Sequence, residues 1–493
     1  MLVADKQRSG GGNLNIPVEF KLCKEEFSDF ADLEQCLFQA TMEAAQEVFR
    51  TILEALDQQL HRERDRKVYR DKGKRKTCIK TRFGVVEYER RVYEVTKADG
   101  LRRHVYLLDE VLGKETVGFV SMTVCRLAVD AVMEGTYRSA AGQVSEMTGL
   151  SISPQAVWNV TQKLGLLQAE EIERQSELAK KEQSQGTLET EILYEEQDGI
   201  WLSLQGQDRQ ERGPRAEMKL AIAYDGALWS TGKKRRTLDN KVAYAGFETA
   251  KEFEQHKEGV VASHYDIAGI ELRVLNGDGA QWIKTAKDPR GIYMLDPFHR
   301  NKAILEAVND PDLRKVMFKL LYSKKIEELL QCIEASIEST LDPAEQEKRR
   351  DLLKYFTNNR DGLLNYYRRG VEIPETRAPE IHHARMGSME SNIFTILGNR
   401  MKGRRACWSI AGGGNLARLL CLKYTTGYGS LFTRAKTGEE CKIQEEYREP
   451  LSADKVRETC GSGYESTFGR MVSDPGWLQK IFAPMIFSEL RFI

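Results

Sequence analysis

The chain has 493 residues, of which 41% are hydrophobic and 30% are charged, a composition typical of soluble globular proteins with several domains. No apolar run approaches the roughly 18 residues that a membrane-spanning helix needs, and the N-terminus lacks a signal-peptide pattern, so we expect a cytoplasmic protein. Nine cysteines without any C-x-x-C spacing argue against a disulfide framework or a zinc site. Basic and acidic residues number 74 each, so any binding of nucleic acid must depend on local clusters.

The N-terminal part combines a long helix with a basic hairpin. After a loose polar tail at 1–20, apolar residues recur at threes and fours from Phe27 to about Arg66, which predicts a long amphipathic helix or helix pair within a unit spanning 21–110. The segment 61–76 is strongly basic, and 77–95 alternates apolar and polar residues as a β-hairpin does. Arg75 and Lys76 are therefore candidates for contact with a phosphate backbone, although a solvated charged surface would have the same composition.

Residues 111–186 contain the pattern of a helix-turn-helix. One helix is predicted around 137–147, a turn at Gly149, and a second helix that begins at Ser153-Pro154. The second helix would offer Gln155, Asn159 and Gln162 to the major groove of DNA, while a helical hairpin without any DNA role is the alternative. A polar, charged linker helix is predicted at 167–185.

From residue 187 the periodicity changes to that of strands. Two β-like runs with Asp198-Gly199 at the turn between them, and a third run at 217–224, predict a three-stranded antiparallel meander. A helix at 247–265 and short strands at 271–275 and 292–295 complete this first part of a core, 187–299. A helical insertion at 300–372, last core helices at 373–425 and a C-terminal region at 426–493 follow.

The helix predicted after Met386 carries an acidic residue in an unexpected place. Ser388 is a plausible N-cap, and an apolar stripe that includes Met389 and Phe394 surrounds Glu390. An ionised carboxylate on the core-facing side of a helix requires a cation, a metal or a proton. The alternative is that Glu390 only complements the helix dipole and reaches water.

Three antiparallel strands, a helix, and then parallel strands with helices are the order of a ribonuclease H-like core. In that fold the acids lie on the first strand, after a central parallel strand and on a helix across the sheet, and Asp198, Asp278 and Glu390 occupy these three places in the sequence. Two divalent cations held by such acids can assist an in-line displacement at phosphorus. Carboxylates without Cys or His favour Mg²⁺ or Mn²⁺ over zinc.

Several segments carry a resemblance to a known family. DGIWL at 198, NGDGAQWIK at 276, LDPFHRNK at 295 and MESNIFTILGNRMKGRRACWS at 389 resemble the Mutator-related DDE transposases of bacterial insertion sequences, in particular the ISLre-type group. The hairpin TRFGVVEYERRVYE, the segment YLLDEVLG and the helix pair YRSAAGQVSEMTGLSIS are also similar, so the resemblance covers roughly 30–425. It implies a metal-binding triad of Asp198, Asp278 and Glu390. It also suggests that Asp296 and His299 form the D-x-x-H motif of such enzymes, with His299 at the catalytic site.

Each assignment has a structural alternative. Asp198-Gly199 is a common hairpin turn, so Glu195 or Glu196 could be the ligand instead, and Asp278 between two glycines could be only a turn. Asp296 before Pro297 has the pattern of a helix N-cap. Trp408 is expected in the core. The following basic residues could contact phosphate near Glu390 or be surface charge: Arg400, Lys402, Arg404 and Arg405.

The sequence therefore predicts a mixed α/β, multidomain DDE-type transposase with N-terminal helices, a β-hairpin, a helix-turn-helix, a ribonuclease H-like core and an all-α insertion. Its expected cofactor is Mg²⁺ or Mn²⁺, and its expected partners are double-stranded DNA, as terminal inverted repeats and as target, and further copies of itself. One alternative is a non-catalytic DNA-binding protein derived from a transposase. Another is a nuclease of the same fold, which would lack the helix-turn-helix and the insertion.

Overall fold

Helices and sheets alternate along the chain, so the protein has the mixed α/β architecture that the sequence predicts. The computed structural model describes residues 28–96, 102–113, 116–183, 186–229, 236–286, 288, 291–403, 405–425 and 428–434. The predicted tail at 1–20, and the predicted C-terminal region apart from 428–434, lie outside the described residues. Within these ranges, each helix is too short or too polar to span a lipid bilayer.

A long helix packs against the basic hairpin. Helix α1 (Phe30–Glu63) is capped by Asp29 and lies on the antiparallel pair β1 (Arg70–Thr81) and β2 (Gly84–Thr96). Asp57 of α1 is only 2% exposed, because it accepts hydrogen bonds from the backbone N–H and the guanidinium of Arg91 at 2.9 and 2.7 Å. The predicted helix and hairpin are confirmed, although the first strand begins seven residues earlier than 77. The sheet is completed by the short strands β3 (Arg102–Val105), β4 (Thr116–Val117) and β5 (Val120–Ser121), and the helix α2 (Leu107–Leu112) lies between β3 and β4 in the chain.

Three helices connect this hairpin to the central sheet. They are α3 (Met122–Glu134), α4 (Tyr137–Met147) and α5 (Pro154–Lys180). The turn between α4 and α5 contacts the hairpin turn, since Gly149 N–H donates to the carbonyl of Arg82 at 3.1 Å. The two helices joined at Gly149 are confirmed, and the helix predicted at 167–185 is present to Lys180 as the second half of α5. Helix α5 continues to Lys180 because Ile172 and Ser176 keep its second half buried.

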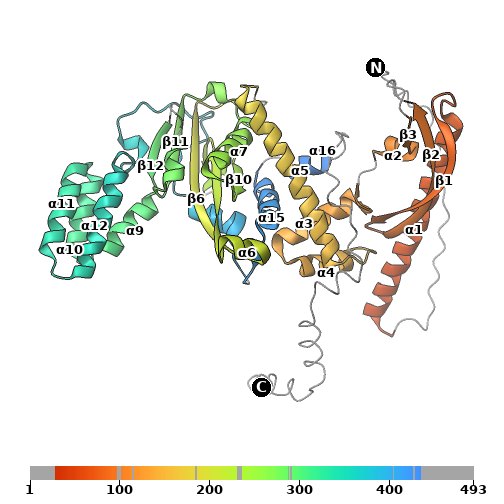
Figure 1. The fold of residues 1–493 in the computed structure, drawn as a ribbon, viewed down its shortest axis with the longest axis horizontal. Helices are drawn as coiled ribbons and strands as arrows, with labels where there is room; N and C mark the ends of the chain where they lie inside the picture. The colour runs from red at the N-terminus through yellow and green to blue at the C-terminus, as the bar shows by residue number, and fades with distance from the viewer. Residues whose placement is uncertain are drawn as a thin grey trace, which may run out of the picture. The chain divides into compact units, whose positions relative to one another are not determined.

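The central sheet contains three antiparallel strands followed by parallel ones (Figure 1). Along β10–β7–β6 neighbouring strands are antiparallel, whereas β11 is parallel to both β6 and β12. The strands in spatial order are β10 (Val242–Gly246), β7 (Arg215–Tyr224), β6 (Ile192–Leu204), β11 (Leu272–Gly277) and β12 (Gly291–Leu295), and β13 (Cys407–Trp408) pairs with the end of β6. Smaller elements between them are α6 (Gly206–Arg212), the hairpin β8 (Gly226–Trp229) and β9 (Arg236–Asp239), α7 (Ala250–Ala262), η2 (Ile267–Gly269) and α8 (Gln281–Lys284).

Each face of this sheet has its own apolar cluster. On one face Tyr194 and Leu220 pack with Met389 and Leu397 from the segment that follows Met386. On the other face Leu193 packs with residues of α7 and of the loop after it. Because successive side chains of a strand point to opposite faces, Glu196 and Asp198 share the face of Tyr194, and Glu195 shares the face of α7.

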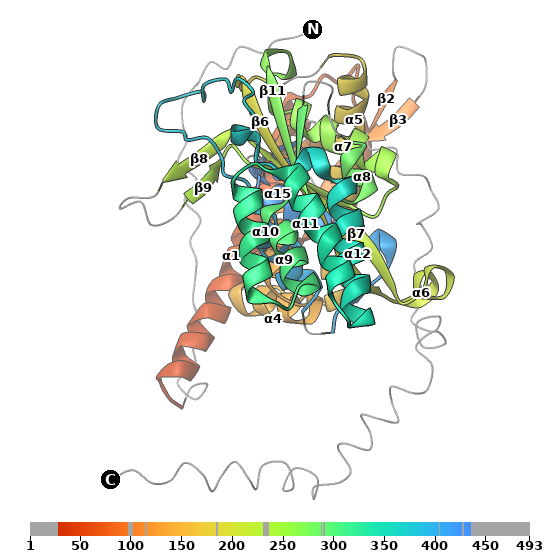
Figure 2. The same ribbon diagram turned by 90° about the vertical axis from the view of Figure 1, so that its left-hand side faces the viewer.

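A block of helices follows β12 and has a separate apolar core (Figure 2). It consists of α9 (Pro297–Ala307), α10 (Pro311–Tyr322), α11 (Ile326–Ser339) and α12 (Pro343–Asn358), followed by the turns η3 (Arg360–Gly362) and η4 (Tyr366–Arg368). The predicted helical insertion is thus confirmed as a helical segment. The chain then returns to the sheet through α13 (Met389–Asn392), the π-helical segment η5 (Ile393–Gly398), α14 (Asn399–Met401), α15 (Ile410–Lys423) and α16 (Tyr428–Arg434).

Gly165 is required where α5 crosses α15. A Cβ atom at this position would lie 2.5 Å from Cβ and 2.8 Å from Cα of Asn415. We expect Gly165→Ala to destabilise the protein by about 1–3 kcal/mol, because the backbone of α15 must move. Gly142 on α4 is the matched control, since a Cβ there meets no atom within 4 Å, and Gly142→Ala should stabilise by up to about 1 kcal/mol. Thermal unfolding of both variants measures this difference, and equal melting temperatures would contradict it.

Candidate metal centre

Three aspartates lie side by side on neighbouring strands of the sheet. Strands β6, β11 and β12 are parallel neighbours, and their registers pair Gly277 with Gln197 and with Leu295. The residues that follow these three positions are Asp198, Asp278 and Asp296. Asp278 and Asp296 follow the carboxyl ends of β11 and β12, where α/β sheets bind ligands, and Asp198 lies level with these ends on β6.

Asp198 lies in the middle of a strand, and the predicted turn at Asp198-Gly199 is wrong. Strand β6 runs without interruption from Ile192 to Leu204, and Asp198 and Gly199 pair with Leu220 and Lys219 of β7. A Cβ on Gly199 would lie 2.2 Å from a carboxylate oxygen of Glu217, so the glycine leaves room for that side chain. The Asp198 carboxylate accepts the Gly199 N–H at 2.7 Å and stays at the surface of the sheet.

Glu390 is placed by a buried carboxylate of β6. Glu196 has no exposed surface and accepts the N–H groups of Gly387 and Ser388 at 2.8 and 2.9 Å. Met386 and Gly387 both have positive φ, 60° and 85°, so this turn is a left-handed one that the carboxylate holds in shape. The Ser388 side chain makes no capping hydrogen bond, and the prediction that it caps the helix is wrong because Glu196 binds the helix start instead.

The face of the helix that carries Glu390 also differs from the prediction. Phe394 is 66% exposed, whereas Asn392 is buried and accepts a hydrogen bond from the Lys241 ammonium at 2.8 Å. The segment η5 is π-helical, so side chains after Asn392 rotate away from the face that an α-helical period of 3.6 predicts. Glu390 itself is 47% exposed in its side chain, and it points to solvent beside the sheet and not into the core.

His299 links Asp296 to Glu390. Asp296 caps α9 by accepting the N–H groups of Phe298 and His299 at 2.9 and 3.1 Å, as its N-cap pattern predicts. The same carboxylate lies 3.2 Å from Nδ1 of His299, whose Nε2 lies 3.4 Å from a carboxylate oxygen of Glu390. The two nitrogens of His299 thus face one buried and one exposed carboxylate.

Asp198, His299 and Glu390 form a group that can hold a metal ion. One ligand atom from each lies within 4.8 Å of the others. Asp278 is not part of this group; its carboxylate accepts the Ala280 N–H at 2.8 Å, while its carbonyl accepts the Tyr355 hydroxyl at 2.5 Å. Carboxylate oxygens suit Mg²⁺ and Mn²⁺, and the imidazole adds a nitrogen ligand that the sequence argument for three acids did not include.

The charges of the group perturb one another. Burial, together with the negative charges of Asp278 and Glu390, raises the pKa of Asp198 from 3.8 to about 6. The hydrogen bond to Asp296, together with the charges of Asp198 and Glu390, raises the pKa of His299 against the opposing effect of burial. Two neighbouring groups with raised pKa values, Asp198 and His299, are typical of functional sites, and the adjacent carboxylates favour a bound cation.

The alternative ligands Glu195 and Glu196 are buried and bind other residues of the protein. Glu195 forms ion pairs with Lys257 at 2.5 Å and with Arg273 at 2.9 Å on the α7 face. Asn276 was not singled out by the sequence, yet its amide donates to Glu196 at 2.9 Å and to Asp296 at 3.0 Å. Its position before Gly277-Asp278 is the signal that could have identified it.

The predicted DNA contacts have different surroundings. Arg400 also has partners within the protein, because its guanidinium donates to the carbonyl of Val132 at 2.6 Å and lies over the rings of Tyr137 and Trp408. Trp408 is buried, as predicted. Gln162 is likewise engaged by Asn415 at 2.8 Å. Arg404 lies outside the described residues. The remaining candidates are exposed: Arg75, Lys76, Gln155, Asn159, Lys402 and Arg405.

Comparison with known proteins identifies the family. The model of an uncharacterised protein family, UPF0236, matches residues 22–436. A UPF0236 protein of Caldanaerobacter subterraneus subsp. tengcongensis is 28% identical over 336 residues, which cover 66% of this chain and 66% of the relative. A UPF0236 protein in the vanSb 3′ region of Streptococcus gallolyticus is 23% identical over 325 residues, 64% of this chain and 66% of the relative. The chain thus spans slightly less than two thirds of the length of these relatives. With a match over most of its length, the chain belongs to the uncharacterised protein family UPF0236.

Proposed function

We propose that this protein is a DDE-type transposase that cuts and joins DNA strands at the ends of an insertion sequence. The observation that carries the proposal is the meeting of Asp198, His299 and Glu390 within 4.8 Å, beside Asp278, at the carboxyl edge of the parallel strands. The strand order β10–β7–β6–β11–β12, with its antiparallel and parallel halves, supports a ribonuclease H-like core. The family resemblance in the segments that carry these residues supports the same assignment.

The residues of the site suit chemistry at a phosphodiester. A divalent cation bound by Asp198 and Glu390, with Asp278 or His299, would supply the positive charge that the transition state at phosphorus requires. Asp296 orients His299 through Nδ1, so that Nε2 would bind the cation in the neutral imidazole, or would donate a hydrogen bond to a phosphate oxygen in the protonated ring that the raised pKa of His299 favours. Glu196 fixes the turn before Glu390, and Asn276 connects that turn to Asp296.

The N-terminal elements supply a DNA-binding surface in this proposal. Arg75 and Lys76 are exposed on β1, and Gln155 and Asn159 are exposed near the start of α5. The hairpin turn contacts the turn between α4 and α5 through the Gly149 N–H, which donates to the carbonyl of Arg82 at 3.1 Å, and it contacts α1 through Gln46, which donates to the carbonyl of Phe83 at 2.9 Å. We propose that α4 and α5 act as a helix-turn-helix on terminal repeats. Joining two ends requires two sites, so we also propose a homo-oligomer on DNA, which light scattering of the complex can test.

Cleavage of a labelled duplex that carries the sequences flanking the gene tests the proposal. Wild-type protein should cut at the repeat boundary in Mg²⁺ or Mn²⁺, whereas Asp278→Asn and Glu390→Gln should bind the duplex without cutting it. Glu334→Gln, which alters an exposed glutamate of α11 outside the cluster, should cut as wild type does. Wild-type protein that binds but does not cut with either metal would instead identify a non-catalytic DNA-binding protein.

A further inference from the structure

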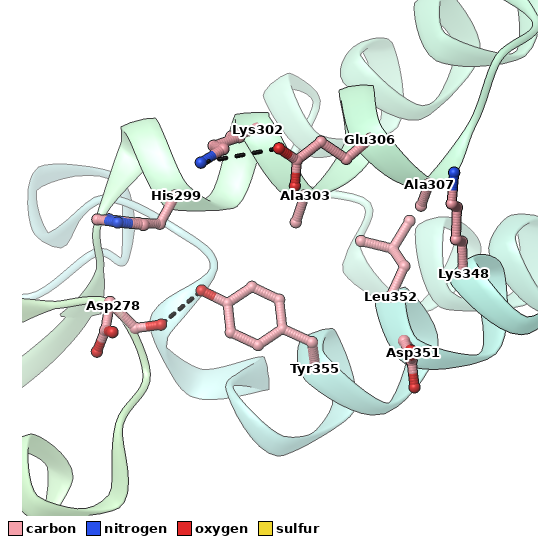
Figure 3. Close-up of a pocket in the computed structure, with 10 residues that line it drawn as sticks. All are labelled: Asp278, His299, Lys302, Ala303, Glu306, Ala307, Lys348, Asp351, Leu352 and Tyr355. Carbon is pink, nitrogen blue, oxygen red and sulfur yellow. Dashed lines mark hydrogen bonds and ion pairs between the residues drawn. The ribbon is translucent and has the colours of Figure 1, made fainter. Parts of the chain in front are cut away.

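A cleft opens beside the candidate metal centre, between α9 and α12. Its volume is about 700 Å³, within the range of roughly 300–1,000 Å³ that is typical of small-molecule sites. Asp278 and His299 line one end of the cleft (Figure 3). A group bound in it would therefore be continuous with a phosphate at the metal centre.

The two helices contribute apolar side chains to opposite walls of the cleft. Ala303 and Ala307 of α9 face Leu352 and Tyr355 of α12 across it. The Tyr355 ring is held in place because its hydroxyl donates to the carbonyl of Asp278 at 2.5 Å. Two alanines leave the space open, and a fixed aromatic ring beside them offers a stacking surface for a planar group.

The rim of the cleft carries charges of both signs. Lys302 and Lys348 supply donors, while Glu306 and Asp351 supply acceptors, and Lys302 lies 3.7 Å from Glu306. Two carboxylates would repel a run of phosphates. They can accept hydrogen bonds from the exocyclic amines of bases, and the lysines can donate to base carbonyls and ring nitrogens. The lining thus matches the edge and the face of a nucleobase better than a sugar–phosphate backbone.

We propose that this cleft receives an unpaired nucleobase of the DNA strand that is cut, from a nucleotide next to the scissile phosphate. The inference rests on the proposed function and adds that the duplex opens at the cleavage position. Enzymes that extrude a base from a duplex must break its stacking and pairing, and this cost is smallest where the base is already unpaired. Tyr355 and the two alanines accept the face of the base, and the rim residues contact its edge.

The test compares two duplexes that carry the gene's flanking sequences, one fully paired and one with a single mismatch beside the cleavage position. Mismatches on either side of the scissile phosphate are assayed separately. With wild-type protein, a mismatch on the correct side should raise the cleavage rate about tenfold, since that factor corresponds to roughly 1.4 kcal/mol of unpairing cost. Ala303→Phe fills the cleft and should remove this preference, giving equal rates on the two duplexes. Leu305→Phe adds a ring at an exposed position of the same helix and should keep the preference.

The ratio of the two rates distinguishes this inference from the proposed function. For each variant the ratio compares its own cleavage rates on the mismatched and the paired duplex. A smaller fraction of folded protein lowers both rates equally and leaves the ratio unchanged. If wild type cuts both duplexes equally, or if Ala303→Phe keeps the tenfold ratio, the cleft does not bind a base and only this inference fails. If wild type cuts neither duplex, the proposed function fails and this inference fails with it. A second variant, Lys348→Ala, should reduce the preference, whereas Lys354→Ala, outside the cleft on the same helix, should not.

Discussion

Asp198→Asn should make the metal-free protein more stable at pH 7.5 and at the same time remove its stabilisation by Mn²⁺. The pKa of Asp198 is raised from 3.8 to about 6, so the fold disfavours the ionised carboxylate. A shift of about two units corresponds to roughly 3 kcal/mol, which partial exposure to solvent reduces to about 1–2 kcal/mol. Asparagine does not ionise and keeps an oxygen for the Gly199 N–H, but it is a poorer metal ligand than a carboxylate.

The pH dependence of this effect has a definite sign. Above pH 6 Asp198 is ionised in both the folded and the unfolded wild type. Its negative charge is unfavourable only in the folded protein, so ionisation lowers the free energy of unfolding. As the pH falls through about 6 toward 4, the folded protein takes up the proton first and wild type gains stability relative to the variant. The advantage of Asp198→Asn should therefore be greatest above pH 7 and vanish near pH 4. Mn²⁺ should stabilise wild type less at pH 5.5 than at pH 7.5, because its ligand is then largely protonated.

Melting temperatures measured from pH 4 to pH 8, with and without MnCl₂, test both parts of this prediction. Asp312→Asn is a suitable control, since the Asp312 side chain is 86% exposed and its replacement should change stability by less than about 0.5 kcal/mol. A variant that melts below wild type at pH 7.5 without metal would show that Asp198 is not electrostatically strained. Equal stabilisation of variant and wild type by Mn²⁺ would exclude Asp198 as a ligand.

Glu196→Ala should lower the free energy of unfolding by about 3–5 kcal/mol, because it leaves several buried donors without an acceptor at once. The carboxylate accepts hydrogen bonds from the Tyr224 hydroxyl at 2.6 Å, from the Asn276 amide at 2.9 Å and from the two N–H groups of the turn before Glu390. Burial raises the pKa of Glu196, and these donors oppose that shift. Glu196→Gln keeps one acceptor oxygen and should have an intermediate effect.

Urea unfolding of Glu196→Ala, Glu196→Gln and Glu191→Ala measures the contribution of this carboxylate. Glu191 precedes the same strand but is exposed, so its replacement should be close to neutral. The loss of Glu196 should also weaken stabilisation by Mn²⁺, since Glu390 is placed by the turn that Glu196 binds. If Glu196→Ala unfolds at the same urea concentration as Glu191→Ala, the turn is held by other contacts.

Local patterns in the sequence were sufficient for much of this fold. The alternation around Phe83 predicted the hairpin, and Asp296 before Pro297 predicted a helix cap that the structure contains. These features depend on interactions between residues that are close in the sequence. The order of strands and helices also placed Asp198 and Asp278 on neighbouring parallel strands, because chain order limits which strands can pair.

The sequence predictions are wrong where contacts between residues far apart in the sequence outweigh the local preference of a segment for a turn or a helix face. Asp198-Gly199 favours a turn, but pairing with β7 keeps it extended. The bond between Glu196 and Gly387 joins residues 191 positions apart, and no local pattern in the sequence predicts it. The π-helical segment turns Phe394 to a different face of the helix. The only glycine or proline in this segment is Gly398 at its end, so the sequence gives no sign of the change at Phe394.

The helices α9 to α12 have an apolar core that is separate from the clusters on either side of the sheet. Cooperative unfolding follows contiguous apolar cores, so we expect the amide hydrogens of this block to exchange independently of those of the sheet, within the one compact unit that contains both. The Tyr355 hydroxyl connects it to the carbonyl of Asp278. The stability of the block therefore influences how long the loop that carries Asp278 keeps its shape, and mild destabilisation of the block should disturb this loop before it affects the sheet.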